Sequence, residues 1–210
     1  MKIIKSNRSN GTMSSKSPIG YTNVAKFAAE NSIAIPGSVM VDVKHTKDDF
    51  RTSVGGAIWI PFADCHPVFV YHKDTKTAVG IHTGWKSILD GVIPEAMKWV
   101  TWPKGVKLEE LCAWIGPGLS QDSFEIKEDV AGMIADKYIT RKDDIHWRLN
   151  MKAMIVDQLM AEGILHENIE FYNEDTLNSE YFSRRTDLKD SKNPSDKSYP
   201  VDTNMAVLSW

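Results

Sequence analysis

Residues 63–91 read ADCHPVFVYHKDTKTAVGIHTGWKSILDG and contain a thiol and imidazoles around two apolar runs. The runs, 68–71 and 78–81, have the composition of strands, and the residues between them have that of a turn. They predict a β-hairpin, which returns the chain to the level it left and so places Cys65 and His82 at the same end. A thiolate beside an imidazole suits zinc or copper. We therefore expect a metal site at this end, with a third protein ligand from another part of the chain.

Four groups of motifs follow one another along the chain: ADCHPV at 63–68, HTGWK at 82–86, IGPG and FEI at 115–118 and 124–126, and YFSRRTD at 181–187. Together they resemble the signature of the YfiH-like family, also called the laccase-domain or multicopper polyphenol oxidoreductase family. The resemblance implies an α/β (α+β) fold, with a single domain over residues 1–210 that consists of layered mixed β-sheets and flanking helices.

The resemblance also implies a function, that of a zinc-dependent purine nucleoside enzyme. Members of the family resemble enzymes that catalyse phosphorolysis of adenosine, inosine or methylthioadenosine and deamination of adenosine, so the expected ligands are a nucleoside and phosphate. Copper is the less favoured metal. Laccase-type oxidation needs several copper ions and many histidines, whereas the 6 histidines of this chain are scattered without a His-x-His pair.

The resemblance completes the metal site with His45. The alternating residues 38–45 predict a strand, and relatives place their first metal-binding histidine at the end of such a strand. The connection from His45 to Cys65 is shorter than is usual in relatives, which indicates that a surface excursion is missing. An isolated cysteine is more often a core residue, but the pairing with His82 favours a ligand or a nucleophile. The predicted metal ligands are therefore His45, Cys65 and His82.

Further residues are candidates for catalysis and substrate binding. Besides Cys65 and His82, the residues Asp64 and Glu125 are candidate proton-transfer or orienting groups. Candidates for binding phosphate, carboxylate or ribose oxygens come from the N-terminal loop, the start of a helix and the C-terminal motif: Arg8, Ser14, Lys86, Arg184 and Arg185. The alternative for each charged residue is a solvated surface position.

Two other functions stay open at this level. In the first, Cys65 is a nucleophile, activated by His82, that cleaves an amide linkage in a peptidoglycan precursor. In the second, the chain is a diverged, non-catalytic protein that binds a nucleoside or nucleotide, because residues of the family pattern are replaced at Val24, Asn173 and Asn204. Metal content, alkylation of Cys65 and product formation from adenosine or inosine distinguish these hypotheses.

Periodicity and turn residues predict the elements around the hairpin. Helices are expected over 22–31, 88–99, 128–138 and 147–161, and strands over 1–5, 54–59, 111–115, 169–172 and 205–210. Residues 1–20 are expected to form an N-terminal strand and loop, and the polar residues 189–200 an exposed loop. We expect structural roles for Cys112, His66 and His72.

Composition narrows the class of protein. The chain has 210 residues, 42% hydrophobic and 25% charged, with a net charge of −3, which is typical of a soluble globular domain. It lacks the basic field that nucleic-acid binding requires, an apolar run of the about 18 residues that a membrane helix needs, and the apolar segment of a signal peptide. The 2 cysteines fit a reducing compartment. We expect a cytoplasmic protein without nucleic-acid or membrane partners, and its oligomeric state stays open.

Overall fold

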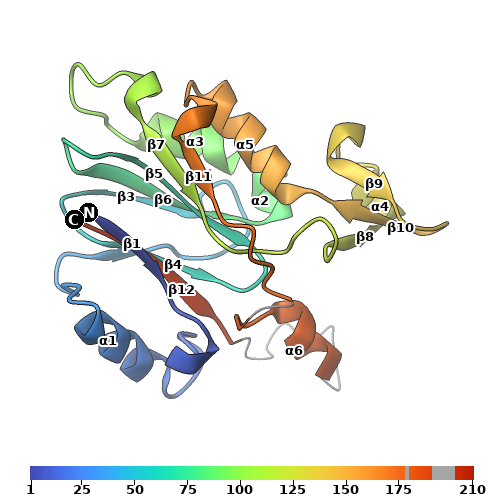
Figure 1. Cartoon of the computed structure of the whole chain (residues 1–210), viewed down its shortest axis with the longest axis horizontal. Coiled ribbons are helices and arrows are strands. Elements are labelled where there is room, and N and C mark those ends of the chain that lie inside the picture. Colours follow the sequence, from blue (N-terminus) through green and yellow to red (C-terminus); the bar gives the residue numbers. More distant parts are fainter. Residues whose placement is uncertain (178–179, 191–201) are drawn as a thin grey trace.

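The computed structural model describes residues 1–177, 180–190 and 202–210. Its strands form three sheets (Figure 1). The four-stranded sheet has the order β1 (Lys2–Lys5), β12 (Asn204–Ser209), β4 (Ile58–Phe62), β2 (Val39–Met40). The five-stranded sheet has the order β11 (Ile169–Phe171), β7 (Cys112–Ile115), β5 (His66–His72), β6 (Thr77–Thr83), β3 (Phe50–Val54). The three-stranded sheet has the order β8 (Glu125–Lys127), β10 (His146–Leu149), β9 (Ile139–Arg141) and projects from one end of the molecule (Figure 1).

Helices cover the outer faces of the two large sheets (Figure 1). The helix α1 (Gly20–Glu30) lies on the four-stranded sheet, and the five-stranded sheet carries α2 (Trp85–Leu89), α3 (Val92–Trp99) and α5 (Met151–Ala161). The short helix α4 (Glu128–Ala131) belongs to the projecting sheet, and α6 (Arg184–Asp190) precedes the last strand. Short 3-10 helices lie in the connections: η1 (Arg8–Asn10), η2 (Leu108–Glu110), η3 (Asp136–Tyr138) and η4 (His166–Asn168).

The two large sheets pack face to face because side chains alternate along their strands. In β4, Ile58 and Ile60 belong to the core between the sheets, whereas Trp59 packs toward α1. In β5, Phe69 lies in the core between the sheets and Val68 packs in the core beneath the outer helices. Strands buried on both faces read as continuous apolar runs, which is the pattern of residues 58–62 and 68–71. The predicted layered fold is confirmed.

The predicted hairpin is present as β5 and β6 in the five-stranded sheet. The two strands pair antiparallel, with Pro67 opposite His82. A Cβ atom at Gly80 would lie 2.6 Å from Ile58 Cγ2 of the other sheet, so glycine allows the sheets to approach at the hairpin. Side chains of the hairpin therefore pack both in the core between the sheets and in the core beneath the outer helices. This packing fixes the position of its open end.

Predicted boundaries in the first half of the chain are partly wrong. The strand expected over 38–45 ends at Met40, so His45 lies in a loop. The strand expected over 54–59 is split by a turn at Gly55, whose φ is +73°. The helix expected over 88–99 is likewise split, because Gly91 adopts a φ of +80° between α2 and α3. Backbone with positive φ favours glycine and ends regular elements.

Predicted boundaries in the second half differ as well. The helix expected over 128–138 consists only of α4 and η3, and residues 147–149 of the helix expected over 147–161 belong to β10. Residues 189–200 were expected to form an exposed loop. Residues 189 and 190 instead belong to the helix α6, which ends at Asp190, and residues 191–200 lie outside the described residues. Residues 1–20 form β1 and a loop, as expected, but with η1 inside it and α1 beginning at Gly20.

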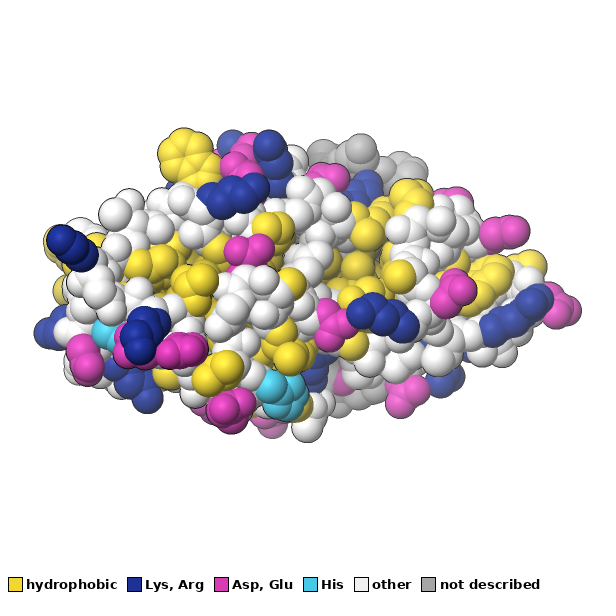
Figure 2. Space-filling view, turned by 90° about the horizontal axis from the view of Figure 1, so that it is seen from above, with side chains coloured by type: hydrophobic (Ala, Val, Ile, Leu, Met, Phe, Trp, Pro, Cys, Tyr) yellow, Lys and Arg dark blue, Asp and Glu magenta, His cyan; other side chains and the backbone are white. Residues whose placement is uncertain are grey.

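Charged side chains of both signs are mixed on one face of the molecule (Figure 2). On the face shown in Figure 2, Lys and Arg side chains are interspersed with Asp and Glu. Within the described part of the chain, no helix has the length and apolar character that crossing a membrane would need.

Candidate metal centre and pocket

The structure brings His45, Cys65 and His82 together. Their candidate donor atoms all lie within 4.8 Å of one another. Cys65 immediately precedes β5, and His82 is the penultimate residue of β6, so the hairpin places them at the same end. His45 comes from the loop between β2 and β3, with its Nε2 atom 3.9 Å from the Cys65 Sγ atom.

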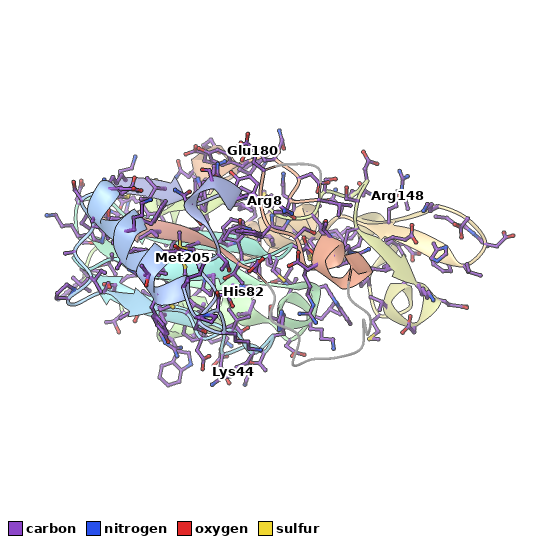
Figure 3. All side chains as sticks on the ribbon, turned by 90° about the horizontal axis from the view of Figure 1, so that it is seen from below. Arg8, Lys44, His82, Arg148, Glu180 and Met205 are labelled. Carbon is purple, nitrogen blue, oxygen red and sulfur yellow. The ribbon has the colours of Figure 1, made fainter. Side chains whose placement is uncertain are left out.

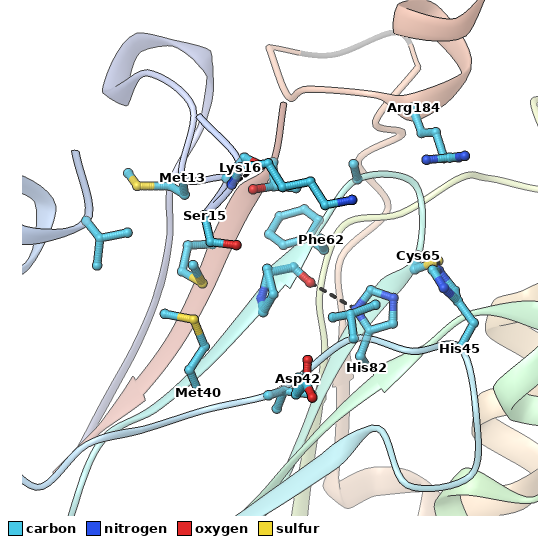
Figure 4. Close-up of a pocket in the computed structure, with 18 of the residues that line it drawn as sticks. Met13, Ser15, Lys16, Met40, Asp42, His45, Phe62, Cys65, His82 and Arg184 are labelled. Carbon is cyan, nitrogen blue, oxygen red and sulfur yellow. Dashed lines mark hydrogen bonds between the residues drawn. The ribbon is translucent and has the colours of Figure 1, made fainter. Parts of the chain in front are cut away.

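The ring of His82 presents an unused lone pair to this group. Its Nδ1 atom lies 2.9 Å from the Pro61 carbonyl oxygen (Figure 4), so Nδ1 carries the proton and donates to that oxygen. The ring is buried, and its Nε2 atom has no hydrogen-bond partner among the described residues. The pKa of His82 is lowered to about 4, mainly by burial and secondly by the neighbouring His45. The ring is therefore neutral near pH 7, with Nε2 free to bind a metal.

The backbone of His45 is held in an uncommon conformation. Its φ is +59°, a region that few residues other than glycine adopt. The backbone N–H groups of Lys44 and His45 donate to the Asp49 carboxylate at 3.0 and 2.6 Å, and the Thr46 hydroxyl donates to it at 3.2 Å. The His45 ring meets the His82 ring edge to face, with centroids 5.4 Å apart. Burial is the main cause that lowers the pKa of His45.

Asp49 is a site residue that sequence reasoning missed. It is fully buried, and its own carbonyl oxygen accepts a hydrogen bond from the His82 backbone N–H at 2.9 Å. One residue thus fixes both the loop of His45 and the strand of His82. No periodicity marks it, because it lies between two short strands in a polar stretch, where an aspartate is ordinarily exposed.

The thiol of Cys65 faces a crowded environment. A Cβ atom at Gly84 would lie 3.0 Å from its Sγ atom and 3.3 Å from His45 Cδ2, so glycine leaves the space that the group occupies. The pKa of Cys65 is raised to about 12, mainly by burial and secondly by the nearby Asp64 carboxylate, whereas the charge of Arg184 acts in the opposite direction. Without a metal, the residue is therefore a thiol at neutral pH, which disfavours its use as a free nucleophile.

The three side chains fit a metal ion. They offer one sulfur and two ring nitrogens, a donor set that suits zinc and copper. The buried His82 Nε2 atom without a partner is otherwise unexplained, since buried polar atoms are nearly always hydrogen-bonded. Catalytic zinc commonly takes three protein ligands and keeps one position for water or substrate, so this donor set would fit such an ion. Within the described residues this is the one group of three such side chains brought together, which does not supply the several sites that multicopper oxidation requires.

A pocket opens beside the three donors. Its volume is about 500 Å³, and all three donor residues line it (Figure 4). Much of its remaining wall is apolar and comes from distant parts of the chain: Met13, Tyr21, Val24, Met40, Val41, Phe62 and Met205. The polar wall consists of the N-terminal loop, one acid, one threonine and one arginine: Ser14, Ser15, Lys16, Asp42, Thr203 and Arg184.

Asp64, a candidate acid or base, serves the structure. Its carboxylate accepts hydrogen bonds from the Thr176 hydroxyl and the Arg185 backbone N–H, both at 2.9 Å, and its carbonyl oxygen accepts one from the Leu119 N–H at 2.9 Å. Burial raises its pKa. Asp64 thus joins three segments beneath Cys65, which makes it an orienting residue. It is not among the residues that line the pocket.

Glu125 is not brought to the pocket. It lies in β8 of the projecting sheet, where its carboxylate forms ion pairs with Lys142 and, at 3.5 Å, with His146. The hydrogen bond from Lys142 is the first cause that lowers its pKa. Figure 3 shows Arg148, which is paired with Glu125 across the same sheet, well away from His82.

The predicted substrate-binding residues divide into two groups. Ser14 and Arg184 line the pocket. Arg8 donates through Nε to the Tyr181 carbonyl oxygen at 2.8 Å, and Arg185 donates through its guanidinium to the Glu125 carbonyl oxygen at 2.7 Å, so both cations face the protein. Lys86 lies over the Trp85 ring, 5.3 Å from its centroid, outside the pocket lining.

His66, His72 and Cys112, which we expected to have structural roles, lie outside the group of three donors. His66 is buried with Nδ1 2.9 Å from the Gly116 carbonyl oxygen, and His72 pairs with the Thr75 hydroxyl at 3.0 Å. Cys112 is partly buried against the core between the sheets.

Comparison with known proteins gives the family. A family model described as multi-copper polyphenol oxidoreductase laccase matches residues 22–192. The chain belongs to this laccase family. Two solved structures have a similar fold. The Bacillus licheniformis hypothetical protein YfiH matches with a TM-score of 0.75 and 19% sequence identity. YlmD from Geobacillus stearothermophilus matches with a TM-score of 0.76 and 15% sequence identity. Each alignment covers 90% of this chain and 79% of the other, and shows a shared fold.

Curated relatives of this laccase-family chain are purine nucleoside phosphorylases by name. One from Xylella fastidiosa (strain Temecula1) is 27% identical over 139 residues, which covers 62% of this chain and 51% of the relative. One from Rickettsia conorii is 26% identical over 164 residues, covering 74% of this chain and 66% of the relative. The chain therefore spans about half to two thirds of the length of these relatives.

Proposed function

We propose that this chain is a zinc-dependent purine nucleoside enzyme, which catalyses phosphorolysis of adenosine, inosine or methylthioadenosine, deamination of adenosine, or both. The observation that carries the proposal is the meeting of His45, Cys65 and His82 at the wall of a pocket of about 500 Å³. The names of the curated relatives support the class of substrate.

The apolar wall of the pocket suits a purine base. A base has two flat, apolar faces, and ligand pockets bury such faces against hydrophobic and aromatic side chains. Phe62 and the methionines Met13, Met40 and Met205 supply this surface (Figure 4). Methionine side chains adapt to flat aromatic groups and contact them favourably through sulfur. The base would then lie along this wall, in the pocket that the three donors also line.

His45, Cys65 and His82 would hold zinc. When bound, the ion supplies a Lewis acid beside the pocket. The chain's own residues prepare this site: the Pro61 carbonyl fixes the His82 tautomer, and the Asp49 carboxylate fixes the backbone of His45. Such partners of metal ligands orient the rings and keep the donors in place.

Asp42 is the carboxylate best placed to accept or hold a proton. It lines the pocket below His82 (Figure 4), whereas the predicted groups Asp64 and Glu125 do not line it. Its carboxylate contacts the Lys44 ammonium at 3.1 Å. A carboxylate oxygen at this position can accept a hydrogen bond from an amine or hydroxyl of the bound ligand.

Incubation of the purified chain with adenosine or inosine and phosphate tests the proposal. Chromatography measures free base, and an ammonia assay measures deamination. Cys65→Ser and His82→Gln should remove both the bound zinc and the product, whereas Cys112→Ser and His72→Gln are matched controls at structural positions.

Each competing function has its own outcome. Tight nucleoside binding without any product would favour the non-catalytic hypothesis. A purified chain that contains no zinc and whose Cys65 is rapidly alkylated would favour the amide hydrolase hypothesis and contradict the metal site.

A further inference from the structure

Asn204 has a polar side chain that is 0% exposed. It is the first residue of β12, where it pairs with Phe62, the last residue of β4. Its neighbours Thr203 and Met205 line the pocket, whereas Asn204 is not among the lining residues. Neighbouring side chains of an extended chain point to opposite sides, so the Asn204 side chain is directed away from the pocket.

The amide of Asn204 uses both of its N–H donors and its oxygen. The Nδ2 atom donates to the Phe62 carbonyl oxygen at 3.1 Å and to the Phe182 carbonyl oxygen at 2.9 Å, and the Oδ1 atom accepts from the Phe182 N–H at 3.0 Å. A backbone N–H only donates and a carbonyl oxygen only accepts, so the orientation of the amide is determined. The side chain thus holds both backbone groups of Phe182 and joins them to the end of β4.

The segment that begins at Phe182 carries Arg184 to the pocket. Arg184 is the first residue of α6 and lines the pocket together with Phe62 and Cys65 (Figure 4). A displacement of the backbone by about 1 Å would move this part of the wall, and errors of that size are sufficient to impair productive binding. The attachment of Phe182 therefore affects the shape of the pocket.

A second attachment holds the other end of this segment. The Arg185 N–H donates to the Asp64 carboxylate at 2.9 Å, and Asp64 immediately precedes Cys65. Both attachments therefore lead to the stretch 62–65, which ends at the sulfur donor. Asp64 adjoins a donor residue, so its replacement would disturb the donor group as well. Asn204 bonds Phe62 and Phe182 and offers the cleaner test.

We propose that Asn204 is a positioning residue of the pocket, whose amide holds Phe182 against the end of β4 and so fixes where Arg184 stands. The inference rests on the proposed function, because it is this pocket that would bind the nucleoside. It also explains a departure from the family pattern that the sequence counted in favour of a non-catalytic protein. In this chain, the residue at position 204 has a structural role beside the pocket.

Steady-state kinetics of the zinc-loaded full chain with adenosine and phosphate test this role. Asn204→Asp keeps the volume and the acceptor for the Phe182 N–H, but it turns an oxygen toward two carbonyl oxygens. Asn204→Ser is a milder variant that removes the amide without adding a charge. In both variants the KM for adenosine should rise on the order of tenfold while kcat stays within about twofold, because the wall is displaced and the donors are not. Zinc affinity, measured by competition with a chelator, should be unchanged.

Amide hydrogen exchange, followed by NMR, tests the positioning without any nucleoside. The Arg185 N–H is bonded to Asp64 and not to Asn204, so it reports on the segment as a whole. Its exchange should accelerate on the order of tenfold in Asn204→Asp and Asn204→Ser, because the segment opens more often once one end is released. Unchanged exchange of this N–H in both variants would overturn the proposal.

Two matched variants separate positioning from a general loss of stability. Leu208→Ala removes a buried side chain from the same strand, and Asn150→Ala removes the amide that accepts from the Ala153 N–H at the start of α5. Both should lower stability and leave the KM for adenosine unchanged. An equal rise of KM in these controls would assign the effect to destabilisation and overturn the proposal.

Failure of the proposal can be distinguished from failure of the proposed function. If the wild-type chain neither binds nor converts adenosine, the proposed function fails, and the exchange of the Arg185 N–H still decides whether Asn204 holds the segment. If the wild type is active and the Asn204 variants keep its KM although exchange accelerates, the reaction stands and the positioning role fails.

Discussion

Replacing Asp49 should loosen the metal centre although all three donor residues remain. The Asp49 carboxylate is 0% exposed and accepts hydrogen bonds from the N–H groups of Lys44 and His45 and from the Thr46 hydroxyl. A hydrogen bond to a charged group contributes about 1.5–3 kcal/mol, and leaving a buried donor unpaired costs a similar amount. Since the three bonds share one acceptor and are not additive, we expect Asp49→Ala to lower the free energy of unfolding by about 3–5 kcal/mol.

Asp49→Asn tests the same contacts with almost unchanged volume. The amide keeps one acceptor but turns a donor toward backbone N–H groups, so we expect a loss of about 2 kcal/mol in unfolding free energy. Without the carboxylate, the φ of +59° at His45 is no longer imposed. Changes in the partners of metal ligands typically reduce metal affinity by about 10–100-fold, and we expect a loss in this range.

The assay measures zinc affinity by competition with a chromophoric chelator, and stability by urea unfolding of the metal-free protein. Asp48→Asn alters the exposed neighbouring carboxylate and should change neither quantity. Leu159→Ala, in the helical core, should lower stability by about 2–5 kcal/mol but leave the zinc affinity of the folded protein intact. Wild-type zinc affinity in Asp49→Asn would refute the positioning role, whatever its stability.

Three further predictions follow from the same contacts. Burial lowers the pKa of His66 from 6.5 to about 4, so between these pH values the unfolded chain binds more protons than the folded chain. The contribution of His66 to the free energy of unfolding is therefore fully present above pH 6.5, and about 3 kcal/mol of it is lost as the pH falls to about 4. Urea unfolding at a series of pH values should show a shallower slope in His66→Gln, and an unchanged slope would contradict the assignment. A Cβ atom at residue 84 would lie 3.0 Å from Cys65 Sγ, so Gly84→Ala should weaken zinc binding by roughly tenfold, whereas Gly132→Ala, where the new atom would be 3.4 Å from Glu128 O, should not. Because burial raises the pKa of Cys65 to about 12, zinc binding should release its proton, and affinity measured by chelator competition should rise about tenfold per pH unit near neutrality; affinity independent of pH would show that the thiolate is not a ligand.

Local patterns were sufficient for the hairpin and for two members of the metal group. The apolar runs 68–71 and 78–81 with a turn between them predict paired strands, and antiparallel pairing then brings Cys65 and His82 together. The layered fold was likewise accessible from the order of the strands and from the motifs of the family. The hairpin depends on contacts between residues that are close in the sequence, and the layered fold depends on the alternation of strands and helices along the chain.

The boundaries that failed have local causes that are weak in the sequence. A glycine with positive φ splits the segment 85–99 at Gly91, but glycine inside a helical pattern is not by itself decisive. Residues 147–149 carry a pattern compatible with a helix, yet they pair with β8 and β9. Tertiary pairing overrides a modest local preference there.

What the sequence alone determined, then, is the hairpin, its order among the other elements, and the types of donor that it carries. Only the tertiary structure decided which cations face the pocket. Lys16 and Arg184 line it, while Arg8 and Arg185 turn to backbone carbonyls. The physical reason is that these side chains come from loops and helix ends far apart in the chain, whose directions are set by packing between the sheets. The left-handed turn at His45 has the same origin, since it depends on a carboxylate whose burial no local pattern records.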